Sequence, residues 1–339
     1  MSSILKMGVL WLALSLFHSS CEEPQSSLPG YAGGFGELLV VVPNSIWKSP
    51  LGDSIYNYLG AMQYGLPQDE RQFNIIHVTP QKFKSVLQTH RNICIVSIDS
   101  NTVRPITLEK SKWSRGQIVI TLSAKNSARL LNTVREHAPR AAEIFASAEV
   151  NRHYLRNKKF GSKTLNQEIG DQQQLTITTQ KDMIIENYKE GVSWLRLERE
   201  RDKGGFRHQI SQGILLFSLP YTDESNFADS NIYHVVDSVL KVNLPGPGEN
   251  QYMQLNFRYI VPQGTEINFK DQFGKEYRGL WRMENNAMGG PIYLLVFLDE
   301  KSDRVVYAYG YVYAPQFNKR EYLREVQGVI HSISIPKDA

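Results

Sequence analysis

The sequence of 339 residues predicts an α+β protein whose first half resembles α/β proteins. In the first half, the segments Glu37–Val42 and Ile93–Ile98 are continuous apolar runs, which are typical of strands buried on both faces. In the second half, strand-like segments outnumber helical ones, and the segments Tyr293–Leu298 and Arg304–Ala314 flank a polar turn, as in a β-hairpin. We therefore expect two α/β layers, the second an antiparallel sheet with helices packed on one face.

The first domain is expected to span residues 36–160. Its apolar runs and helix-start signals predict the order β-α-β-α-β-β followed by a long helix, because Ser49, Thr79 and Ser123 each stand where a helix can begin. The last helix is expected to break near His137 and to restart at Pro139. The predicted strands are Glu37–Val42, Phe73–Val78, Ile93–Ile98 and Gln117–Leu122.

The second domain is expected to span residues 161–339, because residues 160–174 are polar and punctuated by glycine. Helical spacing of apolar residues predicts a helix around Ile232–Leu240, which the sequence Pro245-Gly246-Pro247-Gly248 ends. The predicted strands before the hairpin are Leu175–Thr179, Val192–Glu200, Ile210–Leu219, Tyr252–Val261, Ile267–Lys270 and Tyr277–Met283.

The closing hairpin and helix carry the clearest pattern. Asn318 is a good helix N-cap and Glu321 could complete a capping box, so a helix is expected to about Ile333. Along the last strand, bulky Tyr307, Tyr309 and Tyr311 share one face, and small residues share the other, where we expect the helix to pack. The tyrosine row either packs inside the protein or forms a platform for a sugar or a peptide.

Charge excludes one class of partner. The net charge of +4 and the pI near 8.8 are too mild to indicate nucleic-acid binding, and most basic residues are interleaved with acids. The one tight basic cluster comprises Arg152, Arg156, Lys158 and Lys159. We expect it at a helix C-terminus, where cations complement the helix dipole.

The N-terminus predicts export and lipid anchoring. An apolar run, Met7–Phe17, follows Lys6 and is too short to span a bilayer but suits a signal peptide. The sequence His18-Ser19-Ser20-Cys21 resembles the lipobox of bacterial lipoproteins. That resemblance implies that residues 1–20 are removed and that Cys21 carries palmitate. Residues 21–35 contain Pro24, Pro29 and several serines and glycines, so we expect them to form a flexible tether. Glu22 and Glu23 resemble the acidic signal that directs some Gram-negative lipoproteins to the outer face of the outer membrane.

Signatures of catalysis are absent from the sequence, which contains no G-x-S-x-G, H-E-x-x-H, P-loop or C-x-x-C pattern. No catalytic residue, metal ligand or cofactor is therefore expected. Cys94 lies in an apolar strand and is expected to be a buried small hydrophobe. The most site-like cluster is Tyr277, Arg278, Trp281 and Glu284, which is either a binding site or a surface ion pair beside a strand-entry turn.

Several segments resemble an uncharacterised family of Bacteroidetes envelope lipoproteins that is catalogued as a domain of unknown function. The matching segments of the first half are Gly36-Glu37-Leu38-Leu39-Val40-Val41, Trp47 with Gly52-Asp53, and Thr89-His90-Arg91-Asn92-Ile93. Those of the second half are Gln212-Gly213-Ile214, Asp237-Ser238-Val239-Leu240-Lys241, Pro245-Gly246-Pro247, Tyr252-Met253, Arg278-Gly279-Leu280-Trp281, Met288-Gly289-Gly290-Pro291, Val312-Tyr313-Ala314-Pro315 and Lys319-Arg320. The resemblance implies an envelope lipoprotein and implies no activity.

Together these observations predict a non-catalytic lipoprotein of the outer membrane, on its periplasmic or cell-surface face, that binds a partner protein or an envelope glycan. One alternative is a hydrolase of envelope carbohydrate or peptide that uses carboxylates such as Glu284 and Asp299. Another is a structural subunit of an outer-membrane assembly, which would expose a large apolar patch.

Overall fold

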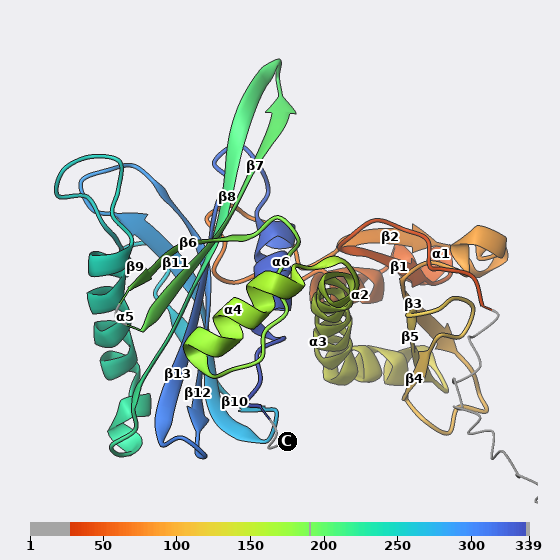
Figure 1. Ribbon diagram of the computed structural model, residues 1–339. Coiled ribbons are helices and arrows are strands. Elements are labelled where there is room, and N and C mark those ends of the chain that lie inside the picture. The colour runs from red at the N-terminus through yellow and green to blue at the C-terminus, as the bar shows by residue number, and fades with distance from the viewer. Residues whose placement is uncertain (1–27, 190, 337–339) are drawn as a thin grey trace, which may run out of the picture.

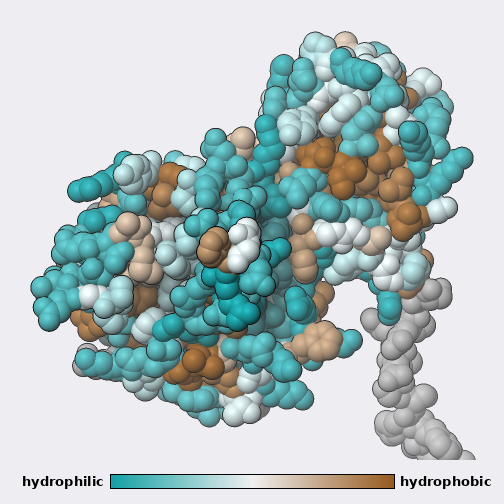
Figure 2. All heavy atoms as spheres, turned by 90° about the horizontal axis from the view of Figure 1, so that it is seen from above, coloured by the Kyte–Doolittle hydropathy of each residue, from teal (hydrophilic) through white to brown (hydrophobic). Residues whose placement is uncertain are grey.

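The structure is a computed structural model that describes residues 28–189 and 191–336. With 31% helix and 38% strand in one mixed and one antiparallel sheet, it confirms the α+β class. Figure 1 shows two bodies side by side, each built on one sheet, with helices α3 (Ser127–Phe160) and α6 (Arg320–Ile330) between the sheets. Figure 2 shows a largely hydrophilic surface with an apolar patch on the body of the first sheet.

The first sheet has the strand order β2-β1-β3-β5-β4, and only β4 runs antiparallel to its neighbour. Its strands are β1 (Glu37–Val41), β2 (Asn74–Val78), β3 (Asn92–Ile98), β4 (Ile106–Lys110) and β5 (Ile118–Ala124). The buried side chains of α2 (Pro50–Leu59) and α3 pack against one face of this sheet, and the short helix α1 (Asn44–Trp47) precedes α2.

Two helix predictions in this body need correction. The helix expected after Pro80 is two 3₁₀ turns, η1 (Pro80–Lys82) and η2 (Ser85–Leu87), because Ser85 has φ of 51°, outside the right-handed helical region. The long helix α3 does not break at Pro139, which lies inside it. Its N-cap is Asn126, whose side chain accepts a hydrogen bond from the Arg129 N–H at 3.0 Å, while the expected cap Ser123 lies in β5.

The second sheet has the order β10-β11-β12-β13-β8-β7-β6, with β9 also paired to β11, and all of these pairs are antiparallel. Its strands are β6 (Ile184–Lys189), β7 (Val192–Lys203), β8 (Phe206–Pro220), β9 (Met253–Asn256), β10 (Gln263–Phe269), β11 (Gln272–Met283), β12 (Gly289–Asp299) and β13 (Arg304–Tyr313). The short helix η3 (Glu224–Phe227) leads into α5 (Asp229–Asn243).

The polar stretch after Phe160 contains a helix that the sequence did not reveal. Helix α4 (Lys163–Gln173) is capped by Ser162 and buries only Leu165, Ile169 and Gln173, so its apolar stripe is too narrow to stand out. The segment Leu175–Thr179, expected as a strand, forms only an isolated bridge between Thr176 and Ser334.

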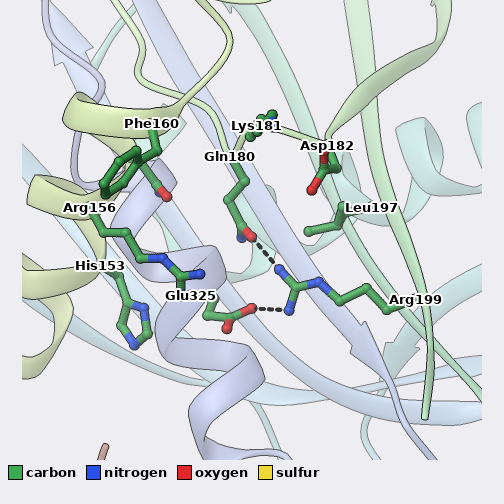
Figure 3. A pocket seen from close by; sticks show the side chains of 10 residues that line it. His153, Arg156, Phe160, Gln180, Lys181, Asp182, Leu197, Arg199 and Glu325 are labelled. Carbon is green, nitrogen blue, oxygen red and sulfur yellow. Dashed lines mark hydrogen bonds and ion pairs between the residues drawn. The ribbon is translucent and has the colours of Figure 1, made fainter.

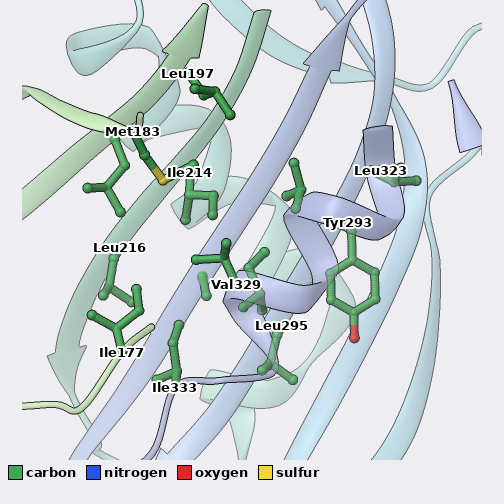
Figure 4. Close-up of a cluster of buried hydrophobic side chains, with 14 of the residues drawn as sticks. Ile177, Met183, Leu197, Ile214, Leu216, Tyr293, Leu295, Leu323, Val329 and Ile333 are labelled. Carbon is green, nitrogen blue, oxygen red and sulfur yellow. The ribbon is translucent and has the colours of Figure 1, made fainter. Parts of the chain in front are cut away.

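Helices cover both faces of the second sheet rather than one. Helix α5 packs on the face that carries the tyrosines, through Ile232, Val236 and Leu240. Helix α6 packs on the small face of β13, as expected, where its apolar stripe meets Val306, Ala308 and Val312. Figure 4 shows Leu323 and Val329 of α6 in this cluster. Both faces of β12 and β13 are apolar, so each requires a cover. A Cβ at Gly310 would lie 2.3 Å from Val326 Cγ1, so glycine permits the close approach of α6.

The start of α6 is capped by a residue from the other body. The expected capping box of Asn318 and Glu321 is wrong, because the N-cap residue is Lys319 and makes no side-chain cap. Instead, the carboxylate of Glu70 accepts hydrogen bonds from the Lys319 N–H at 2.7 Å and the Arg320 N–H at 3.1 Å. Glu321 pairs with the guanidinium of Arg320.

Glu70 belongs to residues 61–72, between α2 and β2, which we call the clasp. Leu66 of the clasp is buried in the hydrophobic cluster between α6 and the second sheet. The Arg320 and Arg324 guanidinium groups donate to the carbonyls of Arg71 and Gln72 at 2.5 and 2.7 Å. The clasp therefore joins the two bodies through apolar burial, a helix cap and backbone acceptors.

Residues 29–35, which were expected to belong to the tether, lie against the first sheet. The Ala32 N–H donates to the Thr89 carbonyl and the Arg91 N–H donates to the Ala32 carbonyl, both at 2.9 Å. Phe35 stacks on His153 of α3 with ring centroids 4.6 Å apart. The expected signal peptide and the lipid-attachment residue Cys21 lie outside the described residues. Among the residues described, no helix is both long and apolar enough to cross a membrane.

The Glu70 cap can be tested by measuring stability. We expect Glu70→Ala to lower the free energy of unfolding by about 2 kcal/mol, because two N–H groups at the start of α6 lose a buried acceptor. Urea denaturation measures this change. Glu109→Ala, which removes an exposed ion pair with Lys112, is the control and should cost about 0.5 kcal/mol or less. Equal losses of unfolding free energy in the two variants would show that the Glu70 cap stabilises the protein no more than an exposed ion pair does.

Candidate ligand-binding site

The tyrosine row is buried and does not form an open platform. Tyr307, Tyr309 and Tyr311 are 1%, 0% and 4% exposed and lie in the cluster that α5 covers. The Trp194 Nε1–H donates to the Tyr311 hydroxyl at 3.2 Å. Burial raises the pKa of Tyr307 to about 12. This arrangement is that of the packing interpretation, in which the rings fill a core.

The cluster of Arg278, Trp281 and Glu284 is not brought together in space. Trp281 is buried in the α5 cluster, where its Nε1–H donates to the Val312 carbonyl at 3.1 Å. Arg278 lies on the other face of β11, over the ring of Tyr293. Glu284 is half-buried beyond the end of β11 and pairs with Arg282 at 2.9 Å. The three side chains therefore do not line a common pocket.

The carboxylates proposed for a hydrolase are also separated. Glu284 lies just before the start of β12, and Asp299 is at the opposite end of this 11-residue strand. The strand rise places them about 30 Å apart, far beyond the ~5–10 Å that paired glycosidase carboxylates need. Asp299 is buried and bonded to Arg304 at 2.8 Å. This version of the hydrolase hypothesis is wrong.

Cys94 is the buried small hydrophobe that the sequence predicts. It is a free cysteine on β3 with no exposed surface. Burial raises the pKa of its thiol to about 12, which keeps it protonated and unreactive.

A cavity of about 370 Å³ lies at the junction of the two bodies (Figure 3). Helix α3, the segment before β6, strand β7 and helix α6 each contribute to its walls. The lining residues are His153, Arg156, Asn157, Phe160, Gln180, Lys181, Asp182, Leu197, Arg199 and Glu325. No serine, threonine, cysteine or tyrosine is among them.

Two buried amide nitrogens at this cavity have no hydrogen-bond partner within the described part of the chain. Arg199 donates to Glu325 at 2.7 Å and to the Oε1 atom of Gln180 at 2.5 Å. A guanidinium can only donate, so the Gln180 oxygen faces Arg199 and its NH₂ group points elsewhere. That nitrogen and the side-chain nitrogen of Asn157 are buried with no hydrogen-bond partner among the described residues. Unpaired buried donors cost about 1–3 kcal/mol each, so acceptor oxygens of water or of a ligand would stabilise these two nitrogens.

The cavity lining carries three basic and two acidic side chains. Arg199 is matched by Glu325, whereas Arg156 and Lys181 are exposed and make no ion pair within the described chain. Burial lowers the pKa of His153, which keeps its imidazole neutral. Asp182 is the remaining acid of the lining. The arrangement can therefore bind a polar ligand that is rich in acceptors.

This site could not be predicted from the sequence, because its walls come from four separated segments. Arg156 was noted only as part of the basic cluster, and its position near the end of α3 agrees with the dipole interpretation. Gln180 and Lys181 lie in a polar connection that carries no motif. The basic cluster that contains Arg156 was the only signal of this site in the sequence.

A buried network beside Arg278 makes stability depend on pH. The Tyr293 hydroxyl donates to Glu276 at 2.7 Å and lies 2.6 Å from His331 Nε2, so the neutral imidazole donates to the tyrosine oxygen. Burial lowers the pKa of His331 to about 4. Below about pH 6.5, His331 is protonated in the unfolded chain but stays neutral in the folded protein. The free energy of unfolding therefore falls as the pH falls toward 4.

We expect the free energy of unfolding to drop between pH 6.5 and pH 4 by on the order of 2 kcal/mol more in the wild type than in His331→Gln. The glutamine amide can still donate to Tyr293 but does not titrate. Urea denaturation across this pH range measures the difference. Parallel curves for the two proteins would contradict the assignment.

Three solved structures each align with 48% of this chain. The Saccharomyces cerevisiae Ran-binding protein Mog1p has 11% identity and a TM-score of 0.31, over 48% of this chain and 89% of its own. A mutant of the protein Mog1 has 12% identity and a TM-score of 0.30, over 48% and 90%. A protein from Bacteroides thetaiotaomicron has 7% identity and a TM-score of 0.26, over 48% and 46%. No curated protein matches the sequence.

Two family models match the chain on either side of the end of α3. Residues 32–158 match the family described as Domain of unknown function (DUF8532). Residues 162–332, which are half of the chain, match the family described as Domain of unknown function (DUF4837). The expected membership of a family of unknown function is confirmed. The chain therefore belongs to the DUF4837 family, and the part before this region is similar to DUF8532.

Proposed function

We propose that this protein is a non-catalytic, lipid-anchored envelope protein that binds an envelope glycan in the junction cavity. The observation that carries the binding proposal is the pair of buried, unpartnered amide nitrogens of Gln180 and Asn157. Sugars present several acceptor oxygens in a small volume, and the cavity of about 370 Å³ is within the usual range of ~300–1,000 Å³ for small-molecule sites.

The composition of the cavity is compatible with binding. Its lining offers amides, guanidinium groups and an aromatic ring, and of its two carboxylates, Asp182 and Glu325, the second is held in an ion pair with Arg199 at 2.7 Å. The imidazole of His153 is stacked on Phe35 and buried. A partner protein, the other ligand class that the sequence suggested, would need a larger contact surface than this cavity provides.

The envelope part of the proposal rests on the sequence. Cys21 would carry the lipid, and it precedes the first described residue, Leu28, by seven positions. Seven extended residues reach at most ~25 Å, so the anchor would hold the globule close to the membrane. The acidic pair Glu22 and Glu23 favours the outer membrane.

The anchor can be tested by labelling. In a Gram-negative host, we expect the full-length protein to incorporate radiolabelled palmitate and to fractionate with membranes, because one cysteine carries the lipid signal. Cys94→Ala is the matched control and should label normally, whereas Cys21→Ala should neither label nor remain with membranes. Equal labelling of wild type and Cys21→Ala would contradict the anchor.

The cavity can be tested by titration calorimetry of the purified protein with D-galactose and D-galacturonate. We expect at least one sugar to bind, and Gln180→Ala to weaken that binding about fivefold, because one hydrogen bond of about 1 kcal/mol is lost. The control is Gln167→Ala, which alters an exposed hydrogen bond with Asp171 on α4. Absence of binding by both sugars, or equal affinity of Gln180→Ala and wild type, would contradict the proposal.

A further inference from the structure

A second cavity of about 770 Å³ adjoins the junction cavity at the last turns of α3. Its walls come from residues 31–35, strands β4 and β5 with the turn between them, and α3. Arg156 and Phe160 line both cavities, so the two hollows share one wall. Resting on the proposed glycan binding, we infer that the two cavities form one extended site for an acidic oligosaccharide, with Arg156 and Phe160 at its centre.

Charge supports an acidic ligand. Seven arginine or lysine side chains line the two cavities, against three aspartate or glutamate side chains. Three of these cations are already matched, because Arg199 pairs with Glu325, Arg140 with Glu143, and Arg152 with Glu149. The unmatched ones are Lys110, Arg156, Lys159 and Lys181, which make no ion pair within the described chain and face only Asp182 as a lining acid without an ion pair.

The position of these charges supports an elongated ligand. Lys181 lines only the junction cavity, Lys110 and Lys159 line only the second cavity, and Arg156 lines both. A ligand with a single carboxylate could neutralise only some of these four basic side chains. An oligosaccharide with one carboxylate on each sugar ring would present a row of negative charges to these cations. Because one such molecule would occupy both cavities at once, the effective concentration of its second part would raise the affinity.

An exposed aromatic ring supports a saccharide. Phe160 is 57% exposed, although it stands on a wall that both cavities share, and the Lys159 ammonium lies 5.0 Å from its ring centroid. A sugar ring presents an apolar face of C–H groups that can pack on such an aromatic face, while its hydroxyls meet amide donors. The unpartnered nitrogens of Asn157 and Gln180 are these donors. The basic cluster at the end of α3 therefore does more than complement the helix dipole.

The inference is tested by calorimetry of the full chain with hexagalacturonate, D-galacturonate, maltohexaose and hexaglutamate. We expect hexagalacturonate to bind about tenfold or more tightly than D-galacturonate, because it reaches both cavities. Arg156→Gln should weaken hexagalacturonate binding about tenfold and should leave the melting temperature unchanged, because this side chain is exposed and unpaired. The matched control is Lys158→Gln, a neighbouring cation that lines neither cavity.

Several outcomes would overturn the inference. If the monomer binds as tightly as the hexamer, or if neutral maltohexaose binds as tightly, the extended acidic site is wrong although the proposed glycan binding stands. If hexaglutamate binds as tightly as hexagalacturonate, the site is one for acidic peptides. If none of the sugars binds, both the extended site and the proposed glycan binding are wrong. Equal losses in Arg156→Gln and Lys158→Gln would indicate nonspecific charge attraction.

Discussion

The carboxylate of Glu70 caps a helix that belongs to the other half of the chain, and the arrangement of the two bodies depends on this contact. The first N–H groups of α6 have no partner within their own helix, and the side chain of the N-cap residue Lys319 supplies none. Glu70 accepts from two of them, and Leu66 of the clasp enters the core beneath α6. A cap and a hydrophobic anchor four residues apart thus fix the clasp on the second body.

With its start held by the clasp, α6 lies between α3 and the second sheet. The contact with α3 is close, since a Cβ at Gly328 would lie 2.7 Å from the Cβ of His153. One face of α6 is buried on the small side of β13, and Glu325 reaches the junction cavity from the helix. The cavity exists because α3, α6 and β7 are held at these positions, so its shape is a consequence of the junction rather than of either body alone.

The sequence predicted those features that repeat along the chain. Alternation along β13 predicted that α6 packs over Ala308 and Gly310, and apolar runs predicted the strands of the first sheet. Contacts between residues that lie far apart in the sequence could not be predicted. Glu70 and Lys319 are 249 positions apart, and the walls of the cavity come from four segments with no motif. The tyrosine row shows a further limit, because an aromatic face on a strand is the same pattern whether a helix or solvent covers it.

The proposed function has two parts that rest on different observations: an anchor indicated by the residues around Cys21, and a site indicated by unpartnered donors and unmatched cations around Arg156. The most direct measurement for the site is amide hydrogen exchange with and without hexagalacturonate. The account predicts slower exchange in residues 153–160 and 180–182 when the oligosaccharide is bound. Unchanged exchange in these segments, together with protection elsewhere on the surface, would contradict it.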